Sequence, residues 1–300
     1  MSYTTAQIMM TLSAIAYVDD TGTPPETIGK KITEELKNAS YATQGNWTLA
    51  WGPVVGAVHD NLAYIAQNGN EMAVVLRGTT PAWESIFEDI PSGQVHFPNA
   101  PSGATVSTEF LHDGLNELLA ATAPTGSTLV NFLKLADPGT LYVTGHSQGG
   151  GLTPMMMAYL QDALSRTAYG HAFAPPTSGN PGFADWITAL NTCTFYINPL
   201  DIVPLGYAAI GDIVSDGIPL DIPASEDGAE IAAAVAASVA AADAVGPWKQ
   251  PETQVILPRV PIYPIIPGDP SFIDKFKAAV GDQHAHNNYL SLLGAPPVTL

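Results

Sequence analysis

Residues 141–151 read LYVTGHSQGGG, and this stretch decides the fold. Four strand-prone residues lead into Gly-His-Ser-Gln-Gly, and an apolar helical segment follows. A serine on a sharp strand-to-helix turn has strained backbone geometry, so its neighbours must be nearly free of side chains. Gly145 and Gly149 meet that need, and we predict that Ser147 is a nucleophile at the carboxyl end of a strand. The alternative is a tight turn that carries an ordinary surface serine.

Composition favours one large α/β domain over residues 1–300, since 46% of the residues are hydrophobic and can fill a substantial core. The formal net charge of −18 opposes contact with polyanions, which excludes nucleic acid as a partner and disfavours strongly anionic membranes. Cys193 is the single cysteine, so no intramolecular disulfide can form. No Cys/His cluster has zinc spacing, and we expect no metal.

The N-terminal residues are predicted to form an amphipathic helix. Thr4 and Gln7 have the spacing of a capping box, and apolar residues recur on one face from Ile8 to Ala16. No basic region precedes an apolar run, and no run reaches transmembrane length. We therefore expect neither a signal peptide nor a transmembrane segment, which leaves a secreted and a cytoplasmic location both open.

Periodicity then predicts alternating elements. The Asn-Gly pair at 68–69 indicates a hairpin turn between two strands. Strands alternating with helices imply a central, mostly parallel sheet with helices on its faces. The predicted strands are 54–58, 62–66, 72–76, the stretch before Ser147, 171–174, 193–197 and 254–257; the predicted helices are 33–38, 107–121, 127–135, the stretch after Ser147, 183–190 and 228–245.

A serine nucleophile needs a base, and the base needs an orienting acid. In α/β hydrolases the chain order is serine, acid and then histidine. Asp201 follows the strand 193–197 and is the best-placed acid. His284 and His286 both come late enough to be the base, and the residues alone do not choose between them.

Several blocks resemble the class 3 lipases, the fungal-type triacylglycerol lipase family of the α/β-hydrolase superfamily. They occur in the family's order. They are Leu12 to Tyr17, Arg77-Gly78-Thr79, Trp83 to Ile90, His112 to Leu115, Thr144 to Ser147 with its three glycines, Ser178 to Ala184, Asp201 to Pro204, and His286-Asn287-Asn288-Tyr289.

The resemblance implies Ser147 as nucleophile, Asp201 as acid and His286 as base, because only His286 has a tyrosine three residues on. It also implies an oxyanion hole made by the backbone N–H groups of Thr79 and Gln148, facing the charge that develops in the transition state. Gln148 stands where the family has leucine, but the hole needs only its N–H. The resemblance implies no cofactor.

Two segments are predicted to cover the cleft. Within residues 80–92, an apolar helical face is formed by Trp83, Ile86, Phe87 and Ile90, which is typical of a lid that turns onto a lipid surface, although an ordinary surface helix has the same pattern. Residues 206–281 are an insertion before the histidines, with an alanine-rich helix, and we expect them to cap the acyl-binding cleft or to be a remote decoration.

The sequence therefore predicts a serine carboxylic ester hydrolase, in first place a triacylglycerol lipase acting at a lipid–water interface. Alternatives with the same chemistry are a phospholipase A1, a feruloyl or aryl esterase and a short-chain esterase. An alternative of another class is a lipid-binding protein without turnover. Oligomeric state is not predicted.

Overall fold

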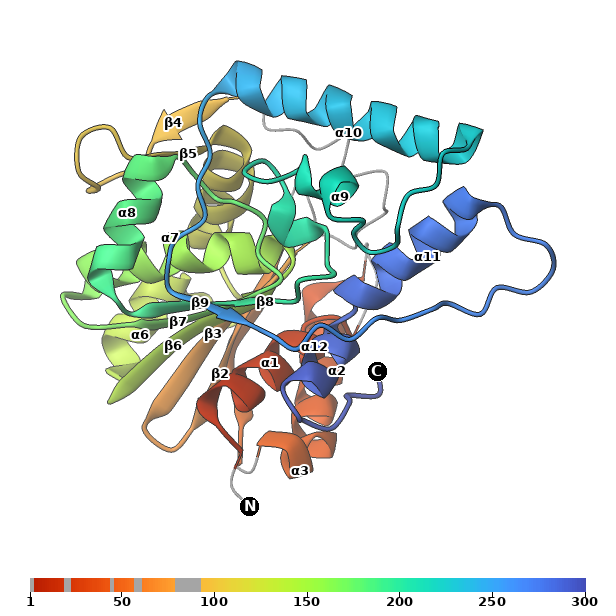
Figure 1. Ribbon diagram of the computed structural model, residues 1–300. Helices are drawn as coiled ribbons and strands as arrows, with labels where there is room; N and C mark the ends of the chain where they lie inside the picture. Colours follow the sequence, from red (N-terminus) through yellow and green to blue (C-terminus); the bar gives the residue numbers. More distant parts are fainter. Residues whose placement is uncertain (1–2, 19–22, 44–45, 57–60, 79–92) are drawn as a thin grey trace.

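The computed structural model describes residues 3–18, 23–43, 46–56, 61–78 and 93–300. Within them, strands form a seven-stranded sheet in the order β1-β2-β3-β6-β7-β8-β9, with helices on both faces (Figure 1). The first three strands pair antiparallel and the others pair parallel from β3 onward. The predicted α/β-hydrolase fold is confirmed. The strands are β1 (Thr48–Val55), β2 (Leu62–Asn68), β3 (Glu71–Arg77), β6 (Thr140–His146), β7 (Tyr169–Phe173), β8 (Cys193–Ile197) and β9 (Gln254–Ile256), with a separate pair β4 (Gln94–His96) and β5 (Thr105–Ser107).

Helices cover the sheet on two sides. Below it in Figure 1 lie α1 (Thr5–Ile15), α2 (Pro25–Asn38), α3 (Ser40–Thr43) and α12 (His286–Leu292). The remaining helical elements are η1 (Phe110–Asn116), α5 (Glu117–Ala120), α6 (Leu129–Ala136), α7 (Gln148–Leu164), α8 (Pro181–Leu190), η2 (Val203–Leu205), α9 (Asp212–Ser215), α10 (Glu226–Val245) and α11 (Phe272–His284).

The two faces of the sheet hold separate apolar clusters, because successive side chains of a strand point to opposite faces. In β3, Met72, Val74 and Leu76 belong to the cluster that includes α7. Ala73 and Val75 belong to the other cluster, with α1 and α12. A strand that is buried on both faces reads as a continuous apolar run, as β3 does.

The N-terminal region confirms one prediction and corrects two. Thr4 and Gln7 make the predicted capping box at the start of α1. The short helix expected at 33–38 is instead the longer α2, because Pro25 occupies the first helical turn, where its missing N–H costs nothing. The strand expected at 54–58 begins earlier, since β1 continues through register shifts around Gly52.

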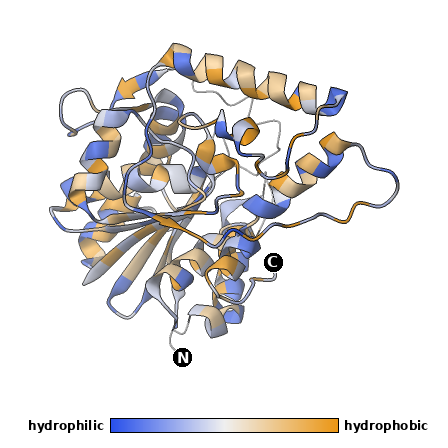
Figure 2. Cartoon of the chain, in the orientation of Figure 1, coloured by the Kyte–Doolittle hydropathy of each residue, from blue (hydrophilic) through white to orange (hydrophobic). Residues whose placement is uncertain are grey.

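Residues 202–280 have a small core of their own. Ile231, Val235 and Ala242 of α10 are buried with Ile213 of α9 and Phe276 of α11. Asp227 of α10 accepts hydrogen bonds from the first backbone N–H groups of α11, at 2.8 Å from Phe272 N. In Figure 1, α10 lies across the top of the molecule, and in Figure 2 it is mostly apolar, with hydrophilic residues at its N-terminal end.

Among the described helices, α10 alone has the length and apolarity that could cross a membrane. Length and composition are the whole of that evidence, and 28% of its most apolar window is buried within the fold. Its buried stripe packs on α9 and α11.

The parallel strands also carry a half-buried histidine. His171 lies on β7, and its Nδ1 is 3.2 Å from the hydroxyl of Tyr196 on β8. Burial lowers the pKa of His171 to about 4. Because an unfolded histidine titrates near 6.5, protons bind the unfolded chain preferentially between these values, and folding stability decreases as pH falls through this window.

We therefore predict that His171→Gln makes the free energy of unfolding less dependent on pH. Between pH 7 and pH 4, the wild type should lose about 2 to 3 kcal/mol more than the variant. Denaturant unfolding of both proteins at several pH values measures this difference. Parallel stability curves over that range would contradict the burial of a neutral His171.

Candidate active site

Ser147 lies on the turn between β6 and α7. Its backbone has φ 61° and ψ −133°, and its N–H donates to the carbonyl of Phe173 at the end of β7. A Cβ on Gly145 would meet the Gly149 carbonyl, and one on Gly149 would meet the Leu76 carbonyl. The predicted need for glycine at both positions is confirmed, because the turn brings three backbone segments into contact.

Asp201 lies just after β8 and is 1% exposed. Its Oδ1 accepts a hydrogen bond from Val203 N at 3.0 Å. Its Oδ2 accepts one from the Tyr289 hydroxyl at 2.8 Å and lies 2.8 Å from His284 Nδ1. A buried carboxylate with this many hydrogen-bond donors is held in a fixed position.

His284 is the last residue of α11 and connects the other two side chains. Its Nε2 lies 2.9 Å from Ser147 Oγ, while its Nδ1 faces Asp201. All three side chains are buried. A serine, an imidazole and a carboxylate in this order are the arrangement that nucleophilic attack by serine requires.

His286 does not take part in this arrangement, so the geometry corrects its choice as the base. Ala285 is extended, with φ −53° and ψ 136°, and separates the end of α11 from the start of α12. His284 consequently faces Ser147, whereas the ring of His286 stacks on Tyr17, with centroids 5.6 Å apart. Burial lowers the pKa of His286, and the neighbouring His284 adds to this effect.

Tyr289, whose spacing from His286 favoured that histidine, contacts Asp201 instead. Tyr289 donates its hydroxyl proton to Asp201 and accepts a hydrogen bond from Asn198 N at 3.2 Å. It therefore holds the acid, whichever histidine is the base. The spacing of histidine to tyrosine in the sequence could not reveal this difference.

A group of hydrogen bonds next to the site was not predicted from the sequence. Asn198 Nδ2 donates to the backbone oxygen and to Oε1 of Gln283, both at 2.9 Å. Asn288 Nδ2 donates to the same backbone oxygen at 3.0 Å. These bonds fix the end of α11 to the loop that carries Asp201. The sequence contains one indication of these hydrogen bonds, which is a polar residue, Asn198, directly after the strand 193–197.

Part of the predicted oxyanion hole lies within the described residues. Gln148 is the first residue of α7, immediately after Ser147. A Cβ on Gly78 would lie 2.7 Å from Gln148 N, so the end of β3 runs directly against the start of α7. Thr79 lies outside the described residues, as do Trp83, Ile86, Phe87 and Ile90 of the predicted lid.

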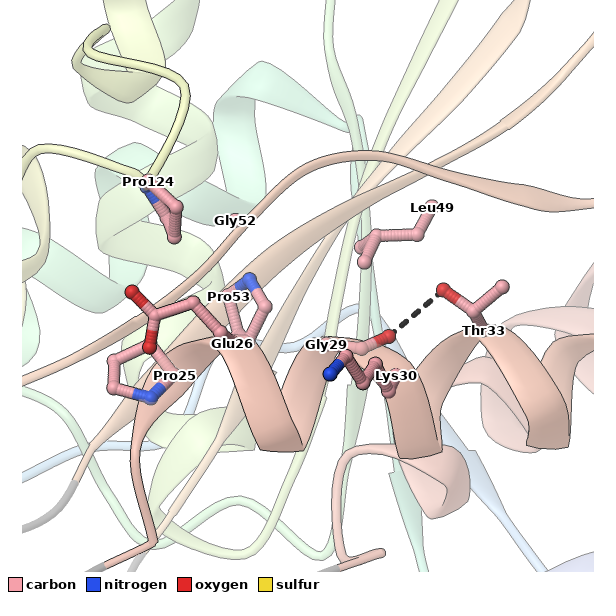
Figure 3. Close-up of a pocket in the computed structure, with 9 residues that line it drawn as sticks. All are labelled: Pro25, Glu26, Gly29, Lys30, Thr33, Leu49, Gly52, Pro53 and Pro124. Atoms are coloured by element: carbon pink, nitrogen blue, oxygen red, sulfur yellow. Dashed lines mark hydrogen bonds between the residues drawn. The ribbon is translucent and has the colours of Figure 1, made fainter.

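Beyond Ser147 and its partners, the described parts of the chain contain a cavity but no candidate metal site. His, Cys, Asp and Glu residues there form no group of three or more that could hold a metal ion. Figure 3 shows a cavity of about 360 Å³ between α2 and β1, with mostly apolar residues around it. Its lining includes Glu26, Lys30 and Pro53, and none of the residues around Ser147.

Comparison with known proteins places this fold among lipases. Residues 73–208 match the family described as lipase (class 3), and the chain is similar to that family over this part. The family match and the lipase structures indicate that the protein is a serine hydrolase. A search among curated proteins finds no match.

Solved structures extend the likeness over the fold. The crystal structure of M37 lipase is 25% identical with a TM-score of 0.82, covering 97% of this chain and 93% of that chain. The Rhizomucor miehei triacylglyceride lipase is 22% identical with a TM-score of 0.53, covering 67% and 72%. A triacylglycerol lipase described as having a serine protease triad at its catalytic centre is 23% identical with a TM-score of 0.51, also covering 67% and 72%. The last two show a shared fold only.

The geometry predicts opposite outcomes for the two late histidines. His284→Ala should lower kcat on an ester by about 10⁴-fold, because no other base reaches Ser147 Oγ within the described residues. His286→Ala should keep kcat within about tenfold of the wild type, since His286 stacks on Tyr17 instead. Steady-state hydrolysis of p-nitrophenyl butyrate measures both, and the reverse ranking would show that the end of α11 is misplaced.

Proposed function

We propose that this protein is a lipase that hydrolyses triacylglycerols, with Ser147 as nucleophile, His284 as base and Asp201 as the acid that orients it. The observation that carries this proposal is the position of the His284 imidazole, 2.9 Å from Ser147 Oγ and 2.8 Å from Asp201 Oδ2. The family supports it, as does a triad in a lipase of the same fold.

In the first half of the reaction, His284 Nε2 takes the proton of Ser147 as Oγ attacks the ester carbonyl carbon. Asp201 accepts from Nδ1 and stabilises the imidazolium that forms. The negative charge on the carbonyl oxygen develops beside the start of α7, where the N–H of Gln148 and, by prediction, that of Thr79 would bind it.

The tetrahedral intermediate then loses the alcohol, which leaves with the proton from His284. Water enters, gives its proton to the same imidazole, and attacks the acyl group on Ser147. The second tetrahedral intermediate expels Ser147 Oγ, which regains its proton, and the fatty acid is released. The first proton transfer joins two atoms that already lie 2.9 Å apart, Ser147 Oγ and His284 Nε2.

Two features support a lipid substrate in particular. The net charge of −18 favours neutral and zwitterionic substrates over anionic ones. In addition, residues 255–265 hold five large exposed apolar side chains, among them Tyr263 at 75% and Ile265 at 98% exposure. In Figure 1 the chain between β9 and α11 projects from the body.

This projecting segment begins close to the reacting groups. Gln283, next to His284, donates through its Nε2 to the backbone oxygen of Val260 at 3.1 Å. Apolar side chains of this kind enter the surface of a lipid phase and hold a protein there. We therefore propose that residues 255–265 face the lipid. They are part of residues 206–281, which we propose as a cap over the acyl cleft, with residues 80–92 as a lid.

Ser147→Ala should lower kcat by about 10⁴-fold or more while the fold is retained, because it removes the nucleophile from an otherwise intact site. Hydrolysis of a triacylglycerol emulsion and labelling by a fluorophosphonate measure the effect, with circular dichroism as the control for folding. Turnover within tenfold of the wild type would sink the assignment. Rates of hydrolysis of phosphatidylcholine, methyl ferulate and tributyrin, each compared with the rate on the triacylglycerol, distinguish a phospholipase, a feruloyl esterase and a short-chain esterase from a triacylglycerol lipase.

The lipid-facing segment can be tested apart from the chemistry. Changing Tyr263 and Ile265 together to serine should lower affinity for a triacylglycerol emulsion by about tenfold or more, because two apolar side chains would no longer be buried in the lipid phase. Hydrolysis of a soluble short ester should stay within about twofold. Leu135→Ser is the matched control, because Leu135 is 87% exposed on α6. Equal losses in all variants would refute the assignment of this side.

A further inference from the structure

His146 is a buried histidine that the proposed reaction does not use. It ends β6, directly before Ser147, and is 3% exposed. Its Nε2 lies 2.9 Å from the backbone oxygen of His284, and the two imidazole rings are 4.7 Å apart, centroid to centroid. A carbonyl oxygen only accepts hydrogen bonds, so Nε2 of His146 carries a proton and donates it.

The other ring nitrogen of His146 faces Tyr17. The Tyr17 hydroxyl lies 3.2 Å from Nδ1 and 3.2 Å from the backbone oxygen of His146. Burial raises the pKa of Tyr17, against a smaller lowering by the Arg77 charge and by a hydrogen bond from the Gly78 N–H. The hydroxyl is therefore protonated, and its one proton is shared between two acceptors, the His146 backbone oxygen and the electron pair on Nδ1 of a neutral His146.

Several groups keep His146 neutral. Burial lowers its pKa well below the usual value, and repulsion from His284 and from His286 lowers it further, against a smaller rise from the His284 carbonyl. Tyr289 approaches the ring edge-on, with centroids 5.5 Å apart. His146 is thus a fixed dipole with one donor and one acceptor, each used.

The carbonyl that His146 binds belongs to the last residue of α11, where helical carbonyls lack intrahelical partners. The base arrives on a helix that packs in the separate cluster of residues 202–280, whereas Ser147 is built on the sheet. The relative position of the two reacting atoms therefore depends on bonds between these parts.

We propose that His146 is a positioning residue, which holds the backbone of His284 so that its imidazole stays within reach of Ser147 Oγ. This role rests on the proposed ester hydrolysis. The His284 carbonyl fixes the tautomer of His146 with the proton on Nε2, and the contact of Tyr17 with Gly78 brings the end of β3 into the same hydrogen-bonded group. Displacement of a reacting group by about 1 Å can cost on the order of 10²-fold in rate.

Two variants of nearly equal shape separate positioning from packing. His146→Gln keeps an amide donor near the place of Nε2, and His146→Met fills the same space without a donor. With p-nitrophenyl butyrate, we expect the Met variant to lower kcat by about 10- to 100-fold with KM within about threefold. The Gln variant should recover kcat to within about fivefold of the wild type.

The rate of fluorophosphonate labelling at Ser147 should follow kcat in both variants. A wild type that is not labelled at Ser147 refutes the proposed hydrolysis itself. A labelled wild type with equal kcat in the Gln and Met variants refutes the positioning role alone. One further measurement needs no variant: histidine ¹⁵N NMR of the wild type at pH 7 should show His146 protonated on Nε2, and a ring protonated only on Nδ1 overturns the proposal.

Discussion

The strained backbone of Ser147 is the constraint on which the rest of the structure depends. A residue other than glycine at φ 61° and ψ −133° costs on the order of 1 to 3 kcal/mol. The surrounding backbone holds it there, since α7 starts against the ends of β3 and β7 with no room for side chains at Gly145 and Gly149. The hydroxyl therefore has one position, and the other reacting groups must be brought to it.

The proposed acid and base reach that position by different routes. Asp201 follows a strand of the same sheet, so the sheet places it. His284 ends α11, and side-chain hydrogen bonds hold that end: Asn198 donates to Gln283, and His146 Nε2 lies 2.9 Å from the His284 carbonyl oxygen. Polar groups within a buried region are effective ties because leaving either partner unpaired is costly.

Much of the fold followed from local pattern. The strand 193–197 was predicted to the residue, and the glycines around Ser147 identified the turn, because steric limits act on neighbouring residues. Asp201 followed from its place after a strand. The histidine that faces Ser147 is His284 and not the predicted His286. Helices α11 and α12 were not predicted from the sequence, and the break between them at Ala285 decides which histidine faces Ser147. The Ser271–Asp274 capping box was the signal for α11. Tyr289 and Asn198 act across 91 positions of chain, which no local pattern reports.

The outer strand β9 affects how molecules of this protein meet one another. An edge strand presents unpaired backbone groups to which a second chain can add. In this chain the edge has three residues, with Val255 and Ile256 exposed, and it is flanked by Pro251 and Pro258. Proline lacks the N–H that a further ladder needs, so pairing cannot extend beyond the short edge in either direction. The protein can thus hold an apolar strand at this edge, at the start of the proposed lipid-facing segment, with little tendency of β9 to pair with a second chain.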